Sequence, residues 1–356
     1  MENWSVIVIG ASSGGFEVLK GLVRGLPEVL QAAILIVWHL SPDAYGVLPA
    51  VLTKEGRLPA ANAVDKEALV PGRIYVAPPD RHLLIENGLV RVTRGPKENR
   101  FRPAIDPLFR SAAYAYGPRA IGVILSGSLD DGTAGLWMVK SKGGITVVQD
   151  PLDATYPSMP RSALDHVDVD FCVAAAELPD LLTRLVNERS QATATDLLKI
   201  DMPEDHRTET EISIAAEGDS FESGIMEQGA LTPFTCPECH GVLAKLQDGR
   251  IVRFRCHTGH AFSTSSLLSS VSENIEESIW NSIRALEENI MLLDKMAADL
   301  SADNPALAEL YRAKAREAEK HTEALRNVVR QHEQLSVESL QQELELTKKA
   351  ANNLSQ

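Results

Sequence analysis

Three residue types that can together cleave an ester follow three separate runs of β-forming residues. Ser12 follows the run 5–9, His39 follows 33–37 and Asp131 follows 120–125. The carboxyl ends of parallel strands meet at one edge of an open sheet, where ligands bind, so we expect these side chains to lie together. A serine nucleophile, a histidine base and an aspartate that orients the imidazole are the parts of an acyl-transfer site. The pattern therefore predicts a serine hydrolase.

Each of the three residues also has a simpler interpretation. Residues 10–15, Gly-Ala-Ser-Ser-Gly-Gly, match Gly-x-Ser-x-Gly, but this hexapeptide alone favours a phosphate-binding turn at a helix N-terminus. A lone His39 at a strand end is more often structural, and Asp131 before a glycine is a good helix N-cap. A dinucleotide site, however, needs an acidic residue where His39 stands, and the third glycine is missing. Taken jointly, the three residues favour catalysis over a nucleotide-dependent reductase.

The elements that must position these residues read as a doubly wound α/β fold with a mostly parallel sheet. The three runs above and two more, 73–76 and 145–148, are continuously apolar, as strands covered on both faces are. Helical patterns fall between them at 16–25, 105–116, 132–142 and 176–187. An antiparallel hairpin is predicted at 82–86 and 89–93, since Asn87-Gly88 suits a type I′ turn.

The charge of the chain is concentrated in one segment. The 356 residues carry 35 Lys and Arg against 49 Asp and Glu, a net charge of −14. Residues 1–190 contribute −2, residues 191–230 contribute −8 and residues 231–356 contribute −4. We therefore expect a catalytic domain at 1–190 and an acidic, disordered linker at 191–230. The acidic balance disfavours nucleic acid, and the chain lacks both a leader pattern and a membrane-length apolar run, so we expect the cytoplasm and no membrane insertion.

A metal-like cluster follows the acidic segment. Cys236-x2-Cys239-x16-Cys256-x3-His260 has the paired spacing of a structural Zn²⁺ site, with His240 and His257 as competing ligands. Three incidental thiols are the alternative. The cluster predicts a zinc-ribbon-like module at 231–265, followed by an α-helical hairpin or coiled coil at 266–352, whose apolar residues recur every three and four positions. The remaining cysteine, Cys172, is expected in a buried strand.

Six ordered blocks also resemble the signature blocks of CheB-type protein-glutamate methylesterases over about residues 4–190. The blocks are VIGASSGG at 8–15, WHLSP at 38–42, VAPPDRHLL at 76–84, RPAIDPLF at 102–109, LSGSLDDG at 125–132 and YPSMP at 156–160. The resemblance implies hydrolysis of glutamate methyl esters on a methylated chemoreceptor-like protein, within the pathway of a cognate methyltransferase. It also implies glutamine deamidation as a related activity, and no cofactor for catalysis.

The resemblance assigns roles to the matching residues. Ser12 is the nucleophile, His39 the general base and acid, and Asp131 the residue that orients the imidazole. The backbone N–H of Ser13 is the expected oxyanion donor. Gly14 and Ser128 complete the expected pocket.

Two departures from the family are expected to matter. Residues 127–132, Gly-Ser-Leu-Asp-Asp-Gly, stand where chemotaxis members commonly have Gly-Met-Gly-Asn-Asp-Gly. The first strand begins at residue 5, so we expect no N-terminal receiver domain and a different form of regulation. An alternative function is a signalling scaffold or sensor whose ribbon and helices bind a partner, with hydrolysis secondary.

A basic cluster lies in the otherwise balanced first domain. It comprises Arg91, Arg94, Lys97, Arg100 and Arg102. A solvated hairpin face is the favoured interpretation, and docking of an acidic receptor helix is the functional one.

Overall fold

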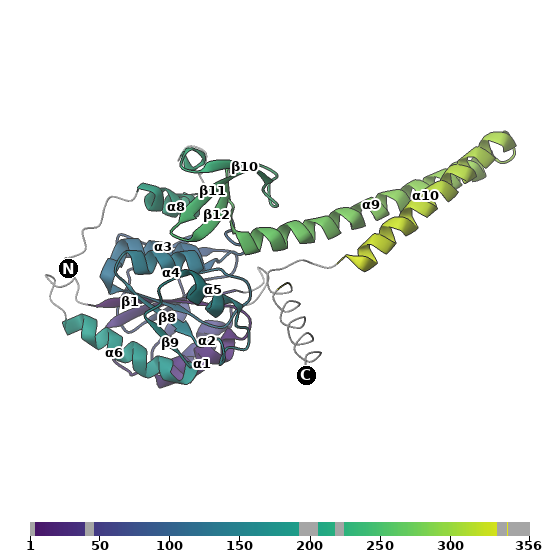
Figure 1. Ribbon diagram of the computed structural model, residues 1–356. Helices are drawn as coiled ribbons and strands as arrows, with labels where there is room; N and C mark the ends of the chain where they lie inside the picture. Colours follow the sequence, from purple (N-terminus) through teal and green to yellow (C-terminus); the bar gives the residue numbers. More distant parts are fainter. Residues whose placement is uncertain (1–3, 40–45, 192–205, 218–223, 333–339, 341–356) are drawn as a thin grey trace, which may run out of the picture. The chain divides into compact units, whose positions relative to one another are not determined.

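The protein is described here from a computed structural model, which describes residues 4–39, 46–191, 206–217, 224–332 and 340 (Figure 1). The chain divides into two compact units, residues 1–267 and 268–356. Within the described part of the chain, no helix combines the length and the apolar character that a bilayer crossing requires.

A seven-stranded sheet in which every neighbouring pair is parallel forms the centre of the first unit. Its strand order is β3-β4-β2-β1-β7-β8-β9. The strands are β1 (Ser5–Ala11), β2 (Ala32–Trp38), β3 (Ala60–Asn62), β4 (Ile74–Val76), β7 (Ala120–Ile124), β8 (Ile145–Gln149) and β9 (Phe171–Val173). The predicted α/β fold is confirmed. The short edge strand β3 was not predicted. Cys172 lies in a strand, β9, as expected, but it is exposed, so the expectation that it is buried was wrong.

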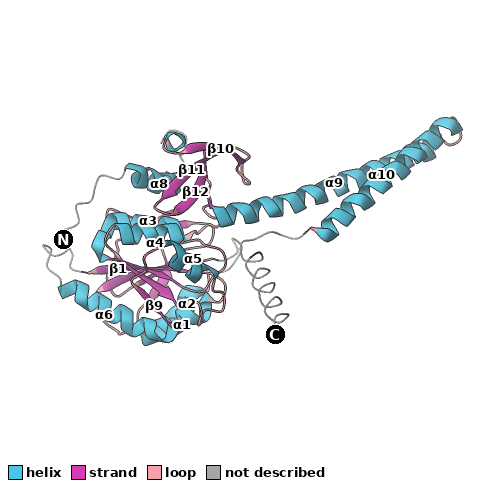
Figure 2. Cartoon of the chain, viewed as in Figure 1, coloured by secondary structure: helices cyan, strands magenta, loops and turns pink. Residues whose placement is uncertain are grey.

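Helices cover both faces of this sheet (Figures 1 and 2). One face packs against α3 (Ile105–Tyr116), α4 (Thr133–Ser141), α5 (Ser158–His166) and the hairpin of β5 (His82–Glu86) and β6 (Leu89–Thr93). The other face packs against α1 (Gly15–Gly25), α2 (Leu48–Glu55) and α6 (Leu178–Gln191), and short helical turns are η1 (Gly117–Arg119) and η2 (Ala175–Glu177).

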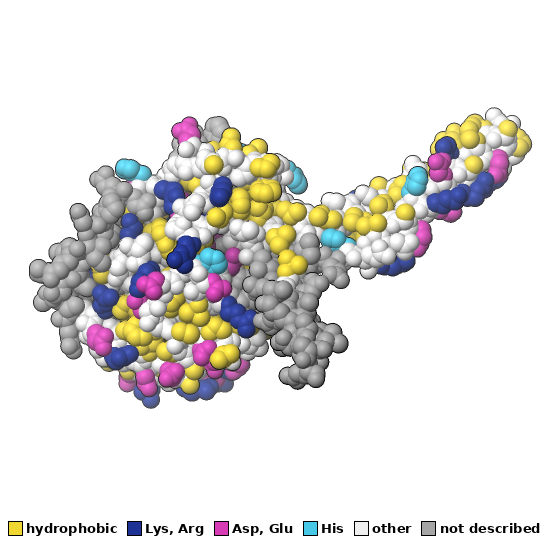
Figure 3. Space-filling view, in the orientation of Figure 1, with side chains coloured by type: hydrophobic (Ala, Val, Ile, Leu, Met, Phe, Trp, Pro, Cys, Tyr) yellow, Lys and Arg dark blue, Asp and Glu magenta, His cyan; other side chains and the backbone are white. Residues whose placement is uncertain are grey.

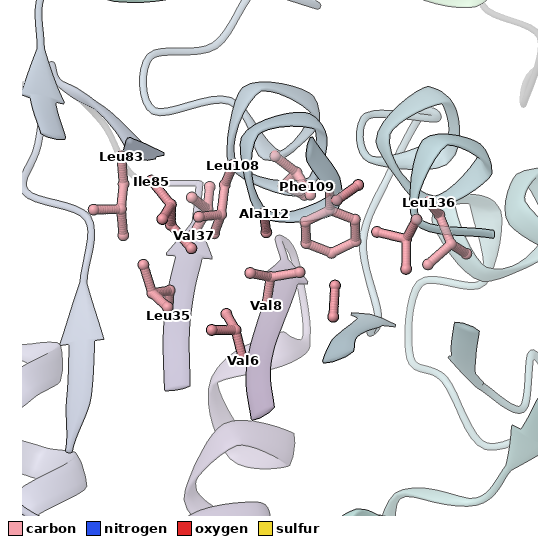
Figure 4. Packing of buried hydrophobic residues seen from close by; sticks show 14 of the residues in the cluster. Val6, Val8, Leu35, Val37, Leu83, Ile85, Leu108, Phe109, Ala112 and Leu136 are labelled. Carbon is pink, nitrogen blue, oxygen red and sulfur yellow. The ribbon is translucent and has the colours of Figure 1, made fainter. Parts of the chain in front are cut away.

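Strand β1 is buried on both sides because successive side chains alternate between the two cores. Val6 and Val8 belong to the core under α3, where Figure 4 shows them below Phe109 and Ala112. Ile7 and Ile9 belong to the opposite core. This double burial explains why the strand is a continuous apolar run.

The rest of the first unit is a second, smaller layer of structure. It comprises helix α8 (His206–Glu217), the turn η3 (Ile225–Glu227) and a four-stranded antiparallel sheet of β10 (Ala230–Thr235), β11 (Val242–Asp248), β12 (Ile251–Cys256) and β13 (Ala261–Ser263). The expectation of a disordered linker was wrong for residues 206–217, which form α8 with Glu211 and Ile214 fully buried. It was also wrong for residues 225–227 and 230, which lie in η3 and β10, and for residue 191, which ends α6. Residues 192–205 and 218–223 lie outside the described part.

The second unit contains most of two long helices, α9 (Thr264–Leu300) and α10 (Pro305–Gln331). Asn304 caps α10 by accepting a hydrogen bond from the Leu307 backbone N–H at 3.1 Å, with Pro305 at the first helical position. An ion pair joins Arg326 to Glu287 across the two helices. Figure 3 shows hydrophobic side chains along their surface. The predicted helices are present, but the end of the predicted hairpin, 333–339 and 341–352, lies outside the described residues.

Candidate active site

Ser12 lies on the tight turn that joins β1 to α1. The Gly15 N–H donates to the Ser12 carbonyl at 3.0 Å, and Gly14 has a φ of 76°, as the third position of a type II turn requires. A Cβ on Gly14 would lie 2.6 Å from the Ser126 hydroxyl oxygen, so only glycine fits there. The turn leaves Ser12 8% exposed at the carboxyl edge of the sheet.

His39 follows the neighbouring strand β2 and reaches the same edge. Its backbone N–H donates to the Ala11 carbonyl at 3.0 Å, which sets His39 beside the residue before Ser12. The Nε2 atom lies 2.8 Å from Asp131 Oδ2. The ring stacks on Phe101 with centroids 3.7 Å apart and planes 10° apart. Nδ1 is buried and has no hydrogen-bond partner among the described residues, so it is the ring nitrogen that can accept a proton.

Asp131 is a buried acceptor of four hydrogen bonds. Besides His39, the Ile105 N–H donates to Oδ2 at 2.7 Å, and the Asp106 N–H donates to Oδ1 at 3.3 Å. The Asn99 side-chain amide donates to Oδ1 at 2.9 Å. The carboxylate thus lies at the N-terminus of α3, where the helix favours negative charge. The simpler interpretation of Asp131 as a cap of the following helix α4 is not supported, because Gly132 occupies the cap position and the described hydrogen bonds of the Asp131 carboxylate go to His39, Asn99 and the start of α3.

The three predicted residues therefore come together at the ends of β1, β2 and β7. Gly127 makes room beside the serine, since a Cβ there would lie 2.8 Å from Ser12 Cβ and 2.1 Å from Met159 Sδ. No hydrogen bond joins Ser12 to His39 within the described ranges. Such contacts are often long in unliganded sites and tighten when substrate binds.

The predicted pocket residues lie around Ser12. Ser13 is exposed, and its carbonyl accepts a hydrogen bond from the Ser126 hydroxyl at 2.8 Å. Gly14 and Ser128 are half-buried. Leu129 has a φ of 64°, a left-handed conformation, at the position where the related motif has glycine. Leu129 in place of the glycine thus adds a side chain to the turn and puts a non-glycine residue in a strained, left-handed conformation.

Three residues at the site were not predicted: Phe101, Asn99 and Asp106. Asn99 and Arg100 have φ values of 49° and 77° and form a tight turn in which Glu98 and Phe101 are hydrogen-bonded. Burial and the nearby charge of Asp131 raise the pKa of Asp106 to about 7. Asp106 lies inside one of the six blocks, which could have pointed to it. The sequence carries no comparable signal for Asn99.

The second site contains the four predicted metal ligands. The ligand atoms of Cys236, Cys239, Cys256 and His260 all lie within 4.8 Å of one another. His260 Nδ1 lies 3.7 Å from Cys236 Sγ and 3.6 Å from Cys256 Sγ, and the Cys239 and Cys256 sulfurs are 3.6 Å apart. A tetrahedral ion with bonds of about 2.3 Å to sulfur and about 2.0 Å to nitrogen needs ligand spacings of about 3.5–3.8 Å. The cluster could therefore hold a metal ion.

Buried charges join the antiparallel sheet to the α/β layer. Glu98 pairs with Arg110 at 3.1 Å and with Arg255 at 2.8 Å, and Glu211 pairs with Arg110 and Arg253 at 2.9 Å each. Burial alone would raise the pKa of Glu211, but the three arginines lower it to about 2. Burial would also raise the pKa of Glu98, but Arg110 and Arg255 together lower it. Both carboxylates are therefore ionised at neutral pH.

The basic cluster predicted from the sequence is largely neutralised by carboxylates. The pairs are Arg91 with Asp65 and Glu86, Arg94 and Arg102 with Asp80, and Lys97 with Glu238. Surface pairs of this kind leave little net positive potential for an acidic partner. The contacts favour the solvated hairpin face over receptor docking.

Comparisons with known proteins identify a family and relatives for about half of the chain. Residues 7–182 match a family described as CheB methylesterase. A Leptospira interrogans (serogroup Icterohaemorrhagiae, serovar copenhageni) protein is 39% identical over 184 residues, which cover 51% of this chain and 95% of that protein. The protein-glutamate methylesterase/protein-glutamine glutaminase of Photorhabdus laumondii is 40% identical over 174 residues, covering 48% of this chain and 49% of that protein.

A solved structure agrees with these matches. The crystal structure of the Thermotoga maritima CheB methylesterase catalytic domain superimposes with a TM-score of 0.50 at 34% identity, covering 51% of this chain and 99% of that chain. The resemblance seen in the six sequence blocks is thereby confirmed. The family match, residues 7–182, includes Ser12, His39 and Asp131.

Proposed function

Because the chain belongs to the CheB methylesterase family, we propose that it hydrolyses glutamate methyl esters on a chemoreceptor-like protein through Ser12, His39 and Asp131. The products are methanol and a glutamate carboxylate. The names of its relatives also support hydrolysis of a glutamine side-chain amide, which releases ammonia by the same acyl chemistry.

The hydrogen bonds at His39 support a specific route for the proton. Ser12 Oγ attacks the ester carbonyl carbon, and its proton moves to His39 Nδ1, the ring nitrogen that has no hydrogen-bond partner among the described residues. Asp131 Oδ2 accepts the Nε2–H at 2.8 Å and stabilises the imidazolium that forms. The tetrahedral intermediate collapses when Nδ1 returns the proton to the departing methoxide, which leaves as methanol.

A second half-reaction restores the serine. Water loses a proton to His39 Nδ1 as it attacks the acyl-enzyme, and the proton then passes to Ser12 Oγ as the C–O bond to the serine breaks. The Ser13 backbone N–H is our proposed donor to the oxyanion, with Gly14 and Ser128 lining the pocket. No step requires a cofactor.

The single observation that carries this proposal is the orientation of the imidazole. The hydrogen bond from Nε2 to Asp131 and the parallel contact with Phe101 fix the ring, while Nδ1 has no hydrogen-bond partner in the part of the chain that the structure describes. A structural histidine would have both nitrogens satisfied when buried. In His39, by contrast, Nδ1 has no hydrogen-bond partner among the described residues, and it lies at the strand end next to Ser12.

We also propose that Cys236, Cys239, Cys256 and His260 bind a structural Zn²⁺. Their spacing suits a closed tetrahedral site that leaves no position for a catalytic water. His257 is exposed and His240 lies outside the cluster, so neither is included in the ligand set. The metal would hold the hairpin of β11 and β12 to the preceding cysteine pair.

The experiment that tests the catalytic proposal measures methanol release from a methyl-labelled chemoreceptor. Wild type and Ser13→Ala are expected to release methanol, since Ser13 acts through its backbone, and Ser12→Ala is expected to release at least 1,000-fold less, on the order of the loss when a nucleophile is removed. Release by Ser12→Ala at the wild-type rate, or no release by wild type from any methylated receptor offered, would contradict the proposal.

A further inference from the structure

We propose that Asn99 is a positioning residue for Asp131, and that β13 and the first turn of α9 hold Asn99 in place. The Cys-rich module would then contribute to the hydrolase site from outside the α/β layer. This inference rests on the proposed function of Ser12, His39 and Asp131.

The Asn99 amide is the only described side chain other than His39 that donates to the Asp131 carboxylate. Its Nδ2 donates to Asp131 Oδ1 at 2.9 Å and to Asp106 Oδ2 at 2.8 Å. One amide nitrogen thus uses both of its hydrogens to bridge two buried carboxyl groups. Asn99 is itself 4% exposed, so water does not offer a substitute donor.

The orientation of this amide is set by residues more than 160 positions later in the chain. The Ser263 N–H donates to Asn99 Oδ1 at 2.8 Å, and the Ser266 hydroxyl donates to the same oxygen at 3.1 Å. These two donors identify the oxygen end of the amide, which forces the nitrogen end toward the carboxylates. A rotated amide would place its NH2 group opposite the Ser263 N–H, so that two donors would face each other, and its oxygen opposite the two carboxyl groups.

The backbone of the turn is held by the same segment. The Asn99 N–H donates to the Ala261 carbonyl at 2.8 Å, and the Ala261 N–H donates to the Lys97 carbonyl at 3.2 Å. The turn therefore pairs with β13, which directly follows His260. Its last residue is Phe101, whose ring stacks on His39. Both contacts that hold the imidazole from this side, through Asp131 and through Phe101, depend on the turn that β13 supports.

Ser263 also contacts the loop that carries Asp131. The Ser263 hydroxyl donates to Asp130 Oδ1 at 2.7 Å, at the residue before Asp131. The family motif commonly has asparagine at this position, as noted above. Ser263 thus contacts Asn99 through its backbone and the catalytic loop through its side chain.

The test measures how fast a fluorophosphonate modifies Ser12, which requires an activated serine but no receptor. The Ser12 Oγ–P bond forms, fluoride leaves, and the proton passes through His39 to solvent. Asn99→Ala is expected to lower the plateau rate about 10- to 100-fold, as when a hydrogen bond to a charged group is lost. The acid limb of the pH profile is expected to move to higher pH, because a less stabilised carboxylate favours imidazolium.

The matched control is Asn87→Ala, which removes an asparagine at a φ of 51° from an exposed hairpin turn. It carries the same backbone cost without touching the site, so its rate and pH profile should equal those of wild type. Ser266→Ala is expected to slow modification about 3- to 10-fold, whereas Thr264→Ala, exposed on the same turn, should not.

The outcomes separate this inference from the proposed function. Equal plateau rates and equal acid limbs for Asn99→Ala and Asn87→Ala would overturn the inference and leave the function intact. Absence of Ser12 modification in wild type would contradict the function itself. Should Asn99→Ala fail to fold, the comparison of Ser266→Ala with Thr264→Ala decides: equal rates overturn the inference.

Discussion

Replacement of Glu211 by glutamine tests whether buried charge joins the antiparallel sheet to the α/β layer. Glu211 lies on α8, is 1% exposed and faces Arg110, Arg253 and Arg255. Burial of Glu211 would raise its pKa, but those arginines have the larger effect and lower the pKa from 4.5 to about 2. A shift of that size corresponds to about 3 kcal/mol of stability at pH 7, at about 1.4 kcal/mol per unit. Loss of one partner from a buried pair costs a similar amount, about 3–5 kcal/mol.

The assay is thermal unfolding of Glu211→Gln beside Glu209→Gln, an exposed glutamate on the same helix. At about 2–4 °C per kcal/mol for a chain of this size, Glu211→Gln should lower the Tm by about 6–12 °C. Glu209→Gln should lower it by about 2 °C or less. Equal losses in the two variants would refute the assignment.

The pH dependence gives a second check on the same variant. Because the folded pKa of Glu211 is depressed, its stabilisation is complete above pH 4.5 and is lost as the pH falls toward 2. The difference in unfolding free energy between wild type and Glu211→Gln should therefore shrink from about 3 kcal/mol at pH 7 to about 2 kcal/mol at pH 3.5. A difference that grows on acidification would show that Glu211 is not the ionised partner of these arginines.

Three further predictions concern other residues. The pKa of Asp106 is raised to about 7, so its stabilising contribution is complete below about pH 4 and is lost as the pH rises to 7. Asp106→Asn should accordingly gain about 2 kcal/mol of stability relative to wild type between pH 5 and pH 7 in chemical unfolding. If it shows no relative gain, the raised pKa of Asp106 is refuted. Metal analysis should find about one Zn²⁺ per chain in wild type and in Cys172→Ser, whose thiol is exposed, but little in Cys239→Ser; retention by Cys239→Ser would contradict the ligand set. Leu129→Gly should relieve a left-handed φ of 64° and raise the Tm by about 2 °C or more, whereas a lower Tm would mean that the side-chain contacts of Leu129 outweigh the strain.

The sequence predicted the sheet and the ends of its strands because burial on both faces leaves a simple apolar pattern. The helix at 105–116 and both strands of the hairpin match their predicted bounds. Once β1, β2 and β7 are parallel neighbours, their following residues must share one edge. The strand order alone therefore predicts that Ser12, His39 and Asp131 lie together.

The residues that the sequence did not reveal depend on contacts between distant segments. Asn99 looks like an ordinary polar residue in a charged stretch, and its role depends on Ser263, 164 positions away. Helix α8 looks like a linker because its sequence is polar, yet Glu211 is buried by arginines from two other elements. The pattern of residues within one segment does not show that a buried charge is paired with a side chain from a distant segment.

The buried arginines also limit how this chain can be divided. A fragment that ends with the family match at residue 182 would keep Ser12, His39 and Asp131. It would also keep Arg110, which is 2% exposed here, and Glu98, while losing Glu211 and Arg255, their partners from the other side. A cut at the end of the family match would therefore separate buried ion-pair partners, and we expect a fragment that runs through Ser266 to be more stable than one that ends at residue 182.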